Sequence, residues 1–197
     1  QANHLSKYLL NIGINTGDKV AVSTTANRTE WHLLDQAVLQ IGAHTVPIYP
    51  TVSNDELEFI YNHSEAKIVF LSDIELLEKT NKVRSNTPLL TQVFTFDKIK
   101  NVVSLHEMIS EGEKLDTDNL VDDLRKKVKT SDLASIIYTS GTTGKPKGVM
   151  LSHENIIQNF MGCQDRVPLR FGKDIALSFL PCSHVYERML LYLYQYG

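Results

Sequence analysis

Apolar residues along the chain alternate between two spacings, one typical of strands and one typical of helices. Short runs rich in β-branched residues predict strands over 19–23, 44–48, 67–71 and 92–96. Between these runs, apolar positions three to four residues apart predict helices over 29–41, from about 53 onward, and over 73–84. This alternation predicts an α/β fold, with parallel or mixed sheets covered by helices.

Local signals refine two of these elements. Ser53 and Glu56 have the spacing of a capping box, so a helix is expected to begin there and to bury Leu57, Ile60 and Tyr61. Pro47 lies inside the second predicted strand and cannot donate a ladder hydrogen bond. We therefore expect that strand to lie near a sheet edge or a bulge.

The second half of the chain changes in composition. Charges of both signs crowd residues 97–132, which predicts a solvated surface excursion with short helical pieces near 105–109 and 120–128. An apolar run over 133–138 then predicts a buried strand.

The last third predicts three more elements. A helix over 152–163, opened by Ser152, should turn Ile156, Ile157, Phe160 and Met161 inward. A strand is expected over 175–180, and the last helix should start near His184.

The charge balance and the cysteines exclude several classes of protein. The 197 residues carry 20 basic and 23 acidic side chains, a net charge of −3, and nothing in this balance favours nucleic acid as a partner. Cys163 and Cys182 are too few for a disulfide framework and lack metal-site spacing, which favours a reducing, cytoplasmic location. No apolar run approaches the ~18 residues that span a bilayer. Both ends interrupt helical patterns, so we expect a fragment of a longer protein.

The richest candidate chemistry lies between Tyr138 and Gly148. Three glycines permit positive φ and an inward-turned nest of N–H groups, four hydroxyls can donate to phosphate or bind a hard cation, and two lysines add positive charge. A polyphosphate is the expected ligand. The residues concerned are Thr139, Ser140, Gly141, Thr142, Thr143, Gly144, Lys145, Lys147 and Gly148.

The two common nucleotide loops do not match this stretch. In a Walker loop the lysine is followed by serine or threonine, whereas Lys145 is followed by Pro146. The spacing of the glycines also departs from G-x-G-x-x-G. A plain glycine-rich hairpin turn remains an alternative, and it explains the glycines but not the hydroxyls and lysines together.

Three segments together resemble the adenylate-forming enzymes, which include acyl-CoA synthetases, luciferases and peptide-synthetase adenylation domains. The stretch 139–148 resembles their phosphate-binding signature. The stretch 180–188 resembles their second signature in its long-chain fatty acyl-CoA synthetase form, and 40–50 resembles an early segment of the family.

This resemblance implies an ATP-dependent long-chain fatty acid–CoA ligase that works through an acyl-adenylate and releases AMP and pyrophosphate. Thr139 would help to hold Mg²⁺, and the stretch from Ser140 to Lys147 would wrap the phosphates, with Lys147 as a catalytic cation. His184 would lie near the α-phosphate and the acyl carboxylate, the alternative being a core histidine. Glu187 and Arg188 would mark the long-chain type or form a surface ion pair.

The resemblance also implies what surrounds the chain. Residues 1–197 would form the N-terminal portion of the AMP-binding domain, without its C-terminal part and lid domain, so the chain alone is expected to be inactive. The partners would be a fatty acid, ATP and CoA, and a lipid substrate is compatible with peripheral membrane contact. Open alternatives are an aryl, short-chain or amino-acid ligase, a phosphotransferase or ATPase, and a non-catalytic scaffold; the oligomeric state is open.

Overall fold

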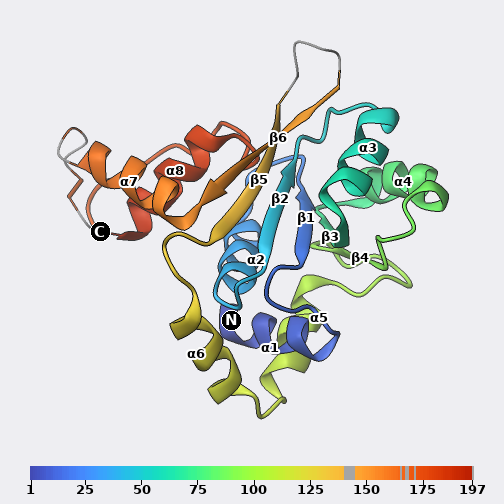
Figure 1. Ribbon diagram of the computed structural model, residues 1–197, viewed down its shortest axis with the longest axis horizontal. Helices are drawn as coiled ribbons and strands as arrows, with labels where there is room; N and C mark the ends of the chain where they lie inside the picture. Colours follow the sequence, from blue (N-terminus) through green and yellow to red (C-terminus); the bar gives the residue numbers. More distant parts are fainter. Residues whose placement is uncertain (140–144, 165, 167–168, 171, 197) are drawn as a thin grey trace.

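A computed structural model describes residues 1–139, 145–164, 166, 169–170 and 172–196. Its centre is a six-stranded sheet in the order β4-β3-β1-β2-β5-β6, in which β1 to β5 run parallel and β6 is antiparallel to β5 (Figure 1). The predicted α/β fold with a mixed sheet is confirmed. The strands are β1 (Lys19–Ser23), β2 (His44–Ile48), β3 (Ala66–Leu71), β4 (Gln92–Thr95), β5 (Leu133–Thr139) and β6 (Lys147–Ser152).

Helices cover both faces of this sheet. The face towards Val20 and Val22 packs against α1, α2 and α5, and the face towards Ala21 packs against α3 and α4. Side chains alternate between faces along a strand, so a parallel strand buried on both sides needs the continuous apolar runs seen in the sequence. The helices are α1 (Ala2–Asn11), α2 (Thr29–Leu39), α3 (Asn54–Ser64), α4 (Ile74–Val83), α5 (Leu105–Glu113), α6 (Asp118–Lys127), α7 (His153–Gln164) and α8 (Val185–Tyr196), with a 3₁₀ turn at Arg84–Asn86.

The capping box predicted for the third helix is present. Ser53 Oγ accepts from the N–H of Glu56, and the Glu56 carboxylate accepts from the N–H of Ser53 at 2.8 Å. The three apolar residues expected on the buried side of α3 are all less than 5% exposed. Local sequence thus fixes both the start of α3 and its orientation.

Pro47 does not mark an edge. Its strand, β2, lies inside the sheet between β1 and β5. The ladder between β2 and β5 is registered only at Thr45 and Ser135, two residues before the proline. Pro47 is still registered with Val22 of β1, but the ladder to β5 ends before it, so its missing N–H is compatible with an interior strand.

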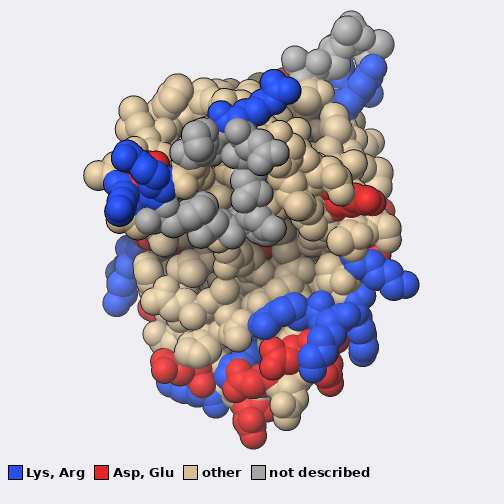
Figure 2. Space-filling model, turned by 90° about the vertical axis from the view of Figure 1, so that its left-hand side faces the viewer, with Lys and Arg blue, Asp and Glu red and all other residues tan. Residues whose placement is uncertain are grey.

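The segment 97–132 is a surface excursion only in part. Leu105 and Met108 of α5 are fully buried, and Gly112 passes so close to α1 that an added Cβ would lie 1.9 Å from the carbonyl oxygen of His4. Helix α6 fits the expectation better, since of its residues only Val121 is buried. Figure 2 shows acidic and basic side chains gathered at the lower end of the molecule, where Figure 1 places α6.

Two expectations near the end of the chain are wrong. Residues 175–180 form no strand: no neighbouring strand is paired with them among the described residues, and Ile175, Leu177 and Phe179 are 99%, 81% and 73% exposed. Met161 of α7 is 44% exposed, whereas Phe160 packs with Met189 and Leu193 of α8. An apolar run predicts a strand only where a partner strand is available.

Helix α8 is fixed to the sheet by a buried ion pair. Arg188 Nη2 lies 2.6 Å from Asp35 Oδ1 of α2, and both side chains are 3% exposed. Arg188 also donates to Thr45 Oγ1 of β2 at 2.9 Å and to Tyr192 Oη at 3.2 Å. Burial raises the pKa of Tyr192, so its hydroxyl stays protonated and donates to Asp35. Arg188 therefore belongs to the core and not to a surface pair with Glu187.

Neutralising Asp35 should destabilise the protein strongly. Asp35→Asn leaves the Arg188 charge buried without its counter-ion, which we expect to lower the free energy of unfolding by about 3–5 kcal/mol. Glu111→Gln is the matched control, because Lys114 and Glu111 also lie 2.6 Å apart but are 67% and 58% exposed. There we expect a change below about 1 kcal/mol. Urea unfolding measures both, and equal small losses would contradict a supporting role for the buried pair.

Candidate functional site

The candidate site lies where β2 and β5 end. In an α/β sheet, ligand groups collect beyond the carboxyl ends of the strands. Here a cavity of about 510 Å³ opens at that place. Among the described residues it is lined by Tyr49, Thr51, Val52, Glu56, Ile60, Ile137, Tyr138, Thr139, Pro146, His184 and Val185.

The predicted phosphate stretch is the connection of a β-hairpin. Thr139, the last residue of β5, lies opposite Lys147, the first residue of β6, in the antiparallel register. Both residues are exposed, and so is Lys145. The antiparallel ladder therefore places a threonine and a lysine directly opposite each other at the base of the loop. The remaining predicted phosphate ligands, Ser140, Gly141, Thr142, Thr143 and Gly144, lie outside the described residues.

His184 joins this site from a distant part of the sequence. It stands immediately before α8 and lines the same cavity as Thr139 and Pro146. It is partly exposed, and its Nδ1 accepts from the N–H of Tyr186 at 3.2 Å. The structure thus places His184 beside the hairpin and not inside a core.

A glycine is needed at position 148 for a reason other than the positive φ that we expected. It belongs to β6, opposite Tyr138, and is not among the described glycines with positive φ. An added Cβ would lie 2.9 Å from Ile136 Cγ2 and 3.3 Å from Tyr138 Cζ. The missing side chain therefore permits close packing of the hairpin, and the nest-forming role predicted for Gly148 is corrected.

Tyr138 ties the hairpin to α3. Its hydroxyl lies 2.8 Å from His63 Nδ1, and the Tyr138 ring meets Phe59 edge to face. Burial raises the pKa of Tyr138 to about 12, so the hydroxyl is neutral at physiological pH. Together with the Gly148 contact, this bond fixes the strand that ends in Thr139.

The sequence did not point to the wall that faces the hairpin. Tyr49, Thr51 and Val52 follow the end of β2, and Glu56 comes from the first turn of α3. The N–H of Ser53 donates to the Glu56 carboxylate and holds the pKa of that carboxyl below its usual value. The available signal was the position of these residues after a strand end, but that signal needs the strand order, which a sequence pattern does not contain.

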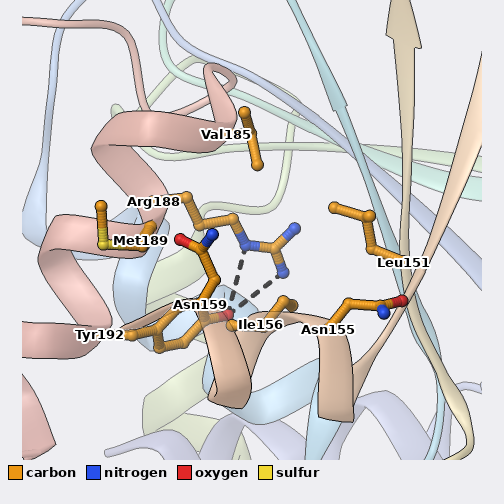
Figure 3. A pocket seen from close by; sticks show the side chains of 8 residues that line it. All are labelled: Leu151, Asn155, Ile156, Asn159, Val185, Arg188, Met189 and Tyr192. Carbon is orange, nitrogen blue, oxygen red and sulfur yellow. Dashed lines mark hydrogen bonds between the residues drawn. The ribbon is translucent and has the colours of Figure 1, made fainter. Parts of the chain in front are cut away.

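A second cavity of about 310 Å³ lies between β6, α7 and α8 (Figure 3). Its walls are mostly apolar, and Arg188 crosses it, with Nε and Nη2 donating to Tyr192 Oη. Val185 lines both cavities, so the two are adjacent. The lining residues are Leu151, Asn155, Ile156, Asn159, Val185, Arg188, Met189 and Tyr192.

The other residues singled out from the sequence serve the fold. Ser152 Oγ accepts from the N–H of Asn155 and caps α7, as expected. Cys182 is fully buried, and burial raises the pKa of its thiol to about 12, which excludes an activated thiolate. No cluster of three or more histidine, cysteine or acidic side chains suited to a metal occurs in the part of the chain that the structure describes.

Comparison with known proteins identifies the family. The model of the family described as "AMP-binding enzyme" matches residues 1–196. The chain belongs to the AMP-binding enzyme family. This confirms the resemblance inferred from the three sequence segments.

Relatives of this AMP-binding enzyme include a long-chain fatty acid–CoA ligase of Mycobacterium bovis, 33% identical over 92% of the chain, and fatty acyl-CoA synthetase A of Dictyostelium discoideum, 32% identical over 100% of it. The chain spans 30% of the length of each. A solved long-chain fatty acid–CoA ligase from Archaeoglobus fulgidus superposes with a TM-score of 0.81 at 29% identity, covering 98% of this chain and 36% of that one.

Close packing at Gly148 yields a test of the hairpin. Gly148→Ala should push β6 away from Ile136 and Tyr138 and cost about 1–3 kcal/mol of folding free energy. Gly162→Ala in α7 is the matched control, because nothing lies within 4 Å of the added Cβ, and it should stabilise the helix by up to about 1 kcal/mol. Chemical denaturation measures both; similar effects of the two substitutions would refute the packing argument.

Proposed function

We propose that this AMP-binding enzyme activates a long-chain fatty acid with ATP, forming an acyl-adenylate and pyrophosphate, and then transfers the acyl group to the thiol of CoA with release of AMP. The observation that carries the proposal is the meeting of Thr139 and His184 in one cavity, with Lys147 directly across the hairpin from Thr139. The named relatives, which are long-chain ligases and acyl-CoA synthetases, support the substrate class.

The first step needs charge stabilisation more than it needs a base. A fatty carboxylate has a pKa near the ~4.3 of a glutamic side chain, so at neutral pH it already is the nucleophile. One of its oxygens bonds to the α-phosphorus, and the bond to the departing pyrophosphate breaks. Negative charge then builds on the leaving group, and the exposed Lys145 and Lys147 are suited to meet it electrostatically.

His184 would act on the reacting end of the substrates. Because it lines the cavity beyond the strand ends, an imidazole N–H there can donate to an α-phosphate or carboxylate oxygen. That donation would orient the two reactants for in-line attack, a contribution of position and not of proton removal.

A magnesium ion would fit only in part on the residues described. Thr139 offers one hydroxyl oxygen at the exposed end of β5. Magnesium keeps several waters and commonly uses phosphate oxygens, with one or two carboxylates. We therefore assign Thr139 a supporting contact, with the other oxygens coming from ATP and water; the ion's charge would help to neutralise the phosphates.

The apolar cavity beside Val185 is the candidate for part of the acyl chain. Leu151, Ile156 and Met189 supply apolar walls next to the site where the carboxylate would react.

No helix in the described part of the chain is long and apolar enough to cross a membrane. We propose a cytoplasmic enzyme that meets its lipid substrate by peripheral membrane contact.

Exchange of labelled pyrophosphate into ATP, measured on the full-length protein with acids from acetate to oleate, tests the proposed function. We expect exchange that rises with long-chain acids, and a loss of about 100-fold or more in Thr139→Ala and Lys147→Ala, because each removes a transition-state contact. Lys127→Ala on the exposed side of α6 is the control. Unchanged rates in both loop variants would remove the role given to the hairpin.

The same assay separates the alternatives. Exchange only with short-chain, aryl or amino acids would retain adenylation and replace the substrate. Release of phosphate in place of pyrophosphate would favour a phosphotransferase or ATPase. A folded full-length protein without exchange or ATP binding would favour a scaffold.

Filling the apolar cavity should change the preferred chain length. Met189→Trp is expected to lower exchange with oleate at least tenfold more than exchange with butyrate, because the larger ring occupies space that a long chain would use. Met189→Leu, which nearly conserves volume, is the control and should preserve the preference. An equal loss with both acids would place the acyl chain elsewhere.

A further inference from the structure

The segment that carries His184 is held in place without the strand pairing that holds Thr139. Thr139 ends a strand with ladder partners on both sides, whereas residues 175–184 have no strand neighbour in the described structure. The side chain of Asn27, from another part of the chain, makes hydrogen bonds to this segment at several points.

Asn27 uses both ends of its amide. Its Nδ2 donates to the carbonyl oxygen of Leu180 at 2.8 Å and to Ser178 Oγ at 2.7 Å. Its Oδ1 accepts from the N–H of Cys182 at 3.1 Å and from the thiol of the same residue. A carbonyl can only accept and a backbone N–H can only donate, so these two backbone partners fix the amide in one orientation.

A tight turn passes this constraint on to His184. The N–H of His184 donates to the carbonyl oxygen of Pro181 at 2.7 Å, and Cys182 and Ser183, between them, are 0% and 6% exposed. Ser183, the one residue between the last Asn27 contact and His184, is thus buried inside a hydrogen-bonded turn.

The residues that follow His184 are anchored to α2. The N–H of Arg188 donates to the carbonyl oxygen of His184 at 3.2 Å, and Arg188 is paired with Asp35 of α2. Asn27 stands two residues before α2 begins. His184 therefore lies between two anchors, Asn27 in the connection from β1 to α2 and Asp35 within α2 itself.

We propose that Asn27 is a positioning residue that sets the place of His184 relative to Thr139 in the cavity. The proposal rests on the role given to His184 in the proposed function. Asparagine is suited to the task because it offers a donor and an acceptor on one rigid plane. Aspartate keeps the acceptor for Cys182 but turns a carboxylate oxygen towards the Leu180 carbonyl.

The experiment is a double-mutant cycle in the pyrophosphate exchange assay, with the full-length protein, ATP and oleate. The variants are Asn27→Ala, Asn27→Asp, His184→Ala and the two double variants. We expect each Asn27 variant to lower kcat about 10- to 100-fold with little change in the KM for ATP, since a displaced group costs rate more than binding. Each double variant should be no slower than His184→Ala alone, because Asn27 then has no histidine left to position.

Asn15→Ala is the matched control. Asn15 Nδ2 also donates to a backbone carbonyl, that of Gly13 at 3.0 Å, but it does so before the amino end of β1, away from the cavity. It should leave kcat unchanged. Thermal unfolding of every variant identifies losses caused by unfolding, and Asn27→Asp serves if Asn27→Ala does not fold.

Each other outcome overturns a specific claim. If the fold-losses in kcat of the Asn27 and His184 single variants multiply in the double variants, Asn27 acts independently of His184 and the positioning role is wrong. If His184→Ala has no effect while the unsubstituted protein exchanges, the role of His184 fails and that of Asn27 fails with it. If the unsubstituted protein shows no exchange with any acid, the proposed function itself is wrong.

Discussion

The buried ion pair of Arg188 and Asp35 is the interaction on which the part of the site around His184 depends. Burying two charges is costly, and the cost is offset only where further hydrogen bonds and close contacts satisfy both groups. Here Thr45 and Tyr192 supply further hydrogen bonds to Nη2 and Nε, and Cζ lies 5.5 Å from the centroid of the Trp31 ring, whereas Nη1 has no hydrogen-bond partner among the described residues. The result is one polar network that joins α2, β2 and α8.

This network reaches the hairpin through the sheet. Ser135 of β5 donates to the carbonyl oxygen of Thr45 at 2.8 Å, and both side chains are fully buried. The same two residues form the registered contact between β2 and β5. A displacement of Arg188 would therefore be felt both at the start of α8 and at the strand that leads to Thr139.

The sequence predicted those parts of the fold that depend on neighbouring residues. The first four strands were placed within one residue of their observed bounds, and Ser53 marked the start of α3, because burial on two faces and capping both leave local patterns. The strand expected over 175–180 failed because pairing depends on a distant partner. The surface ion pair considered as one alternative for Arg188 failed for the same reason: Asp35, its partner, lies 153 positions earlier.

In the candidate site, too, the sequence predicted what depends on neighbouring residues and missed what depends on distant ones. The hydroxyls, glycines and lysines of the hairpin are consecutive, so their chemistry could be inferred directly. The cavity wall made by Tyr49 and Glu56 and the hydrogen bonds made by Asn27 could not be inferred. The order of the strands in the sheet brings these side chains to the site, and a sequence pattern does not contain that order. Gly148 shows a subtler limit, since a glycine in a signature can serve positive φ or close packing, and only the cross-strand neighbours distinguish the two.

The two halves of the site are therefore held by different kinds of force. Thr139 and Lys147 are fixed by a backbone ladder, which tolerates most side-chain changes provided that Gly148 stays small. His184 sits in a local backbone turn that is joined to the rest of the fold through side chains, the amide of Asn27 on one side and the guanidinium of Arg188 on the other. Side-chain anchors are specific in geometry and sensitive to single substitutions. It follows that the relative position of hydroxyl and imidazole, on which orientation of the reactants would depend, is controlled mainly from the His184 side.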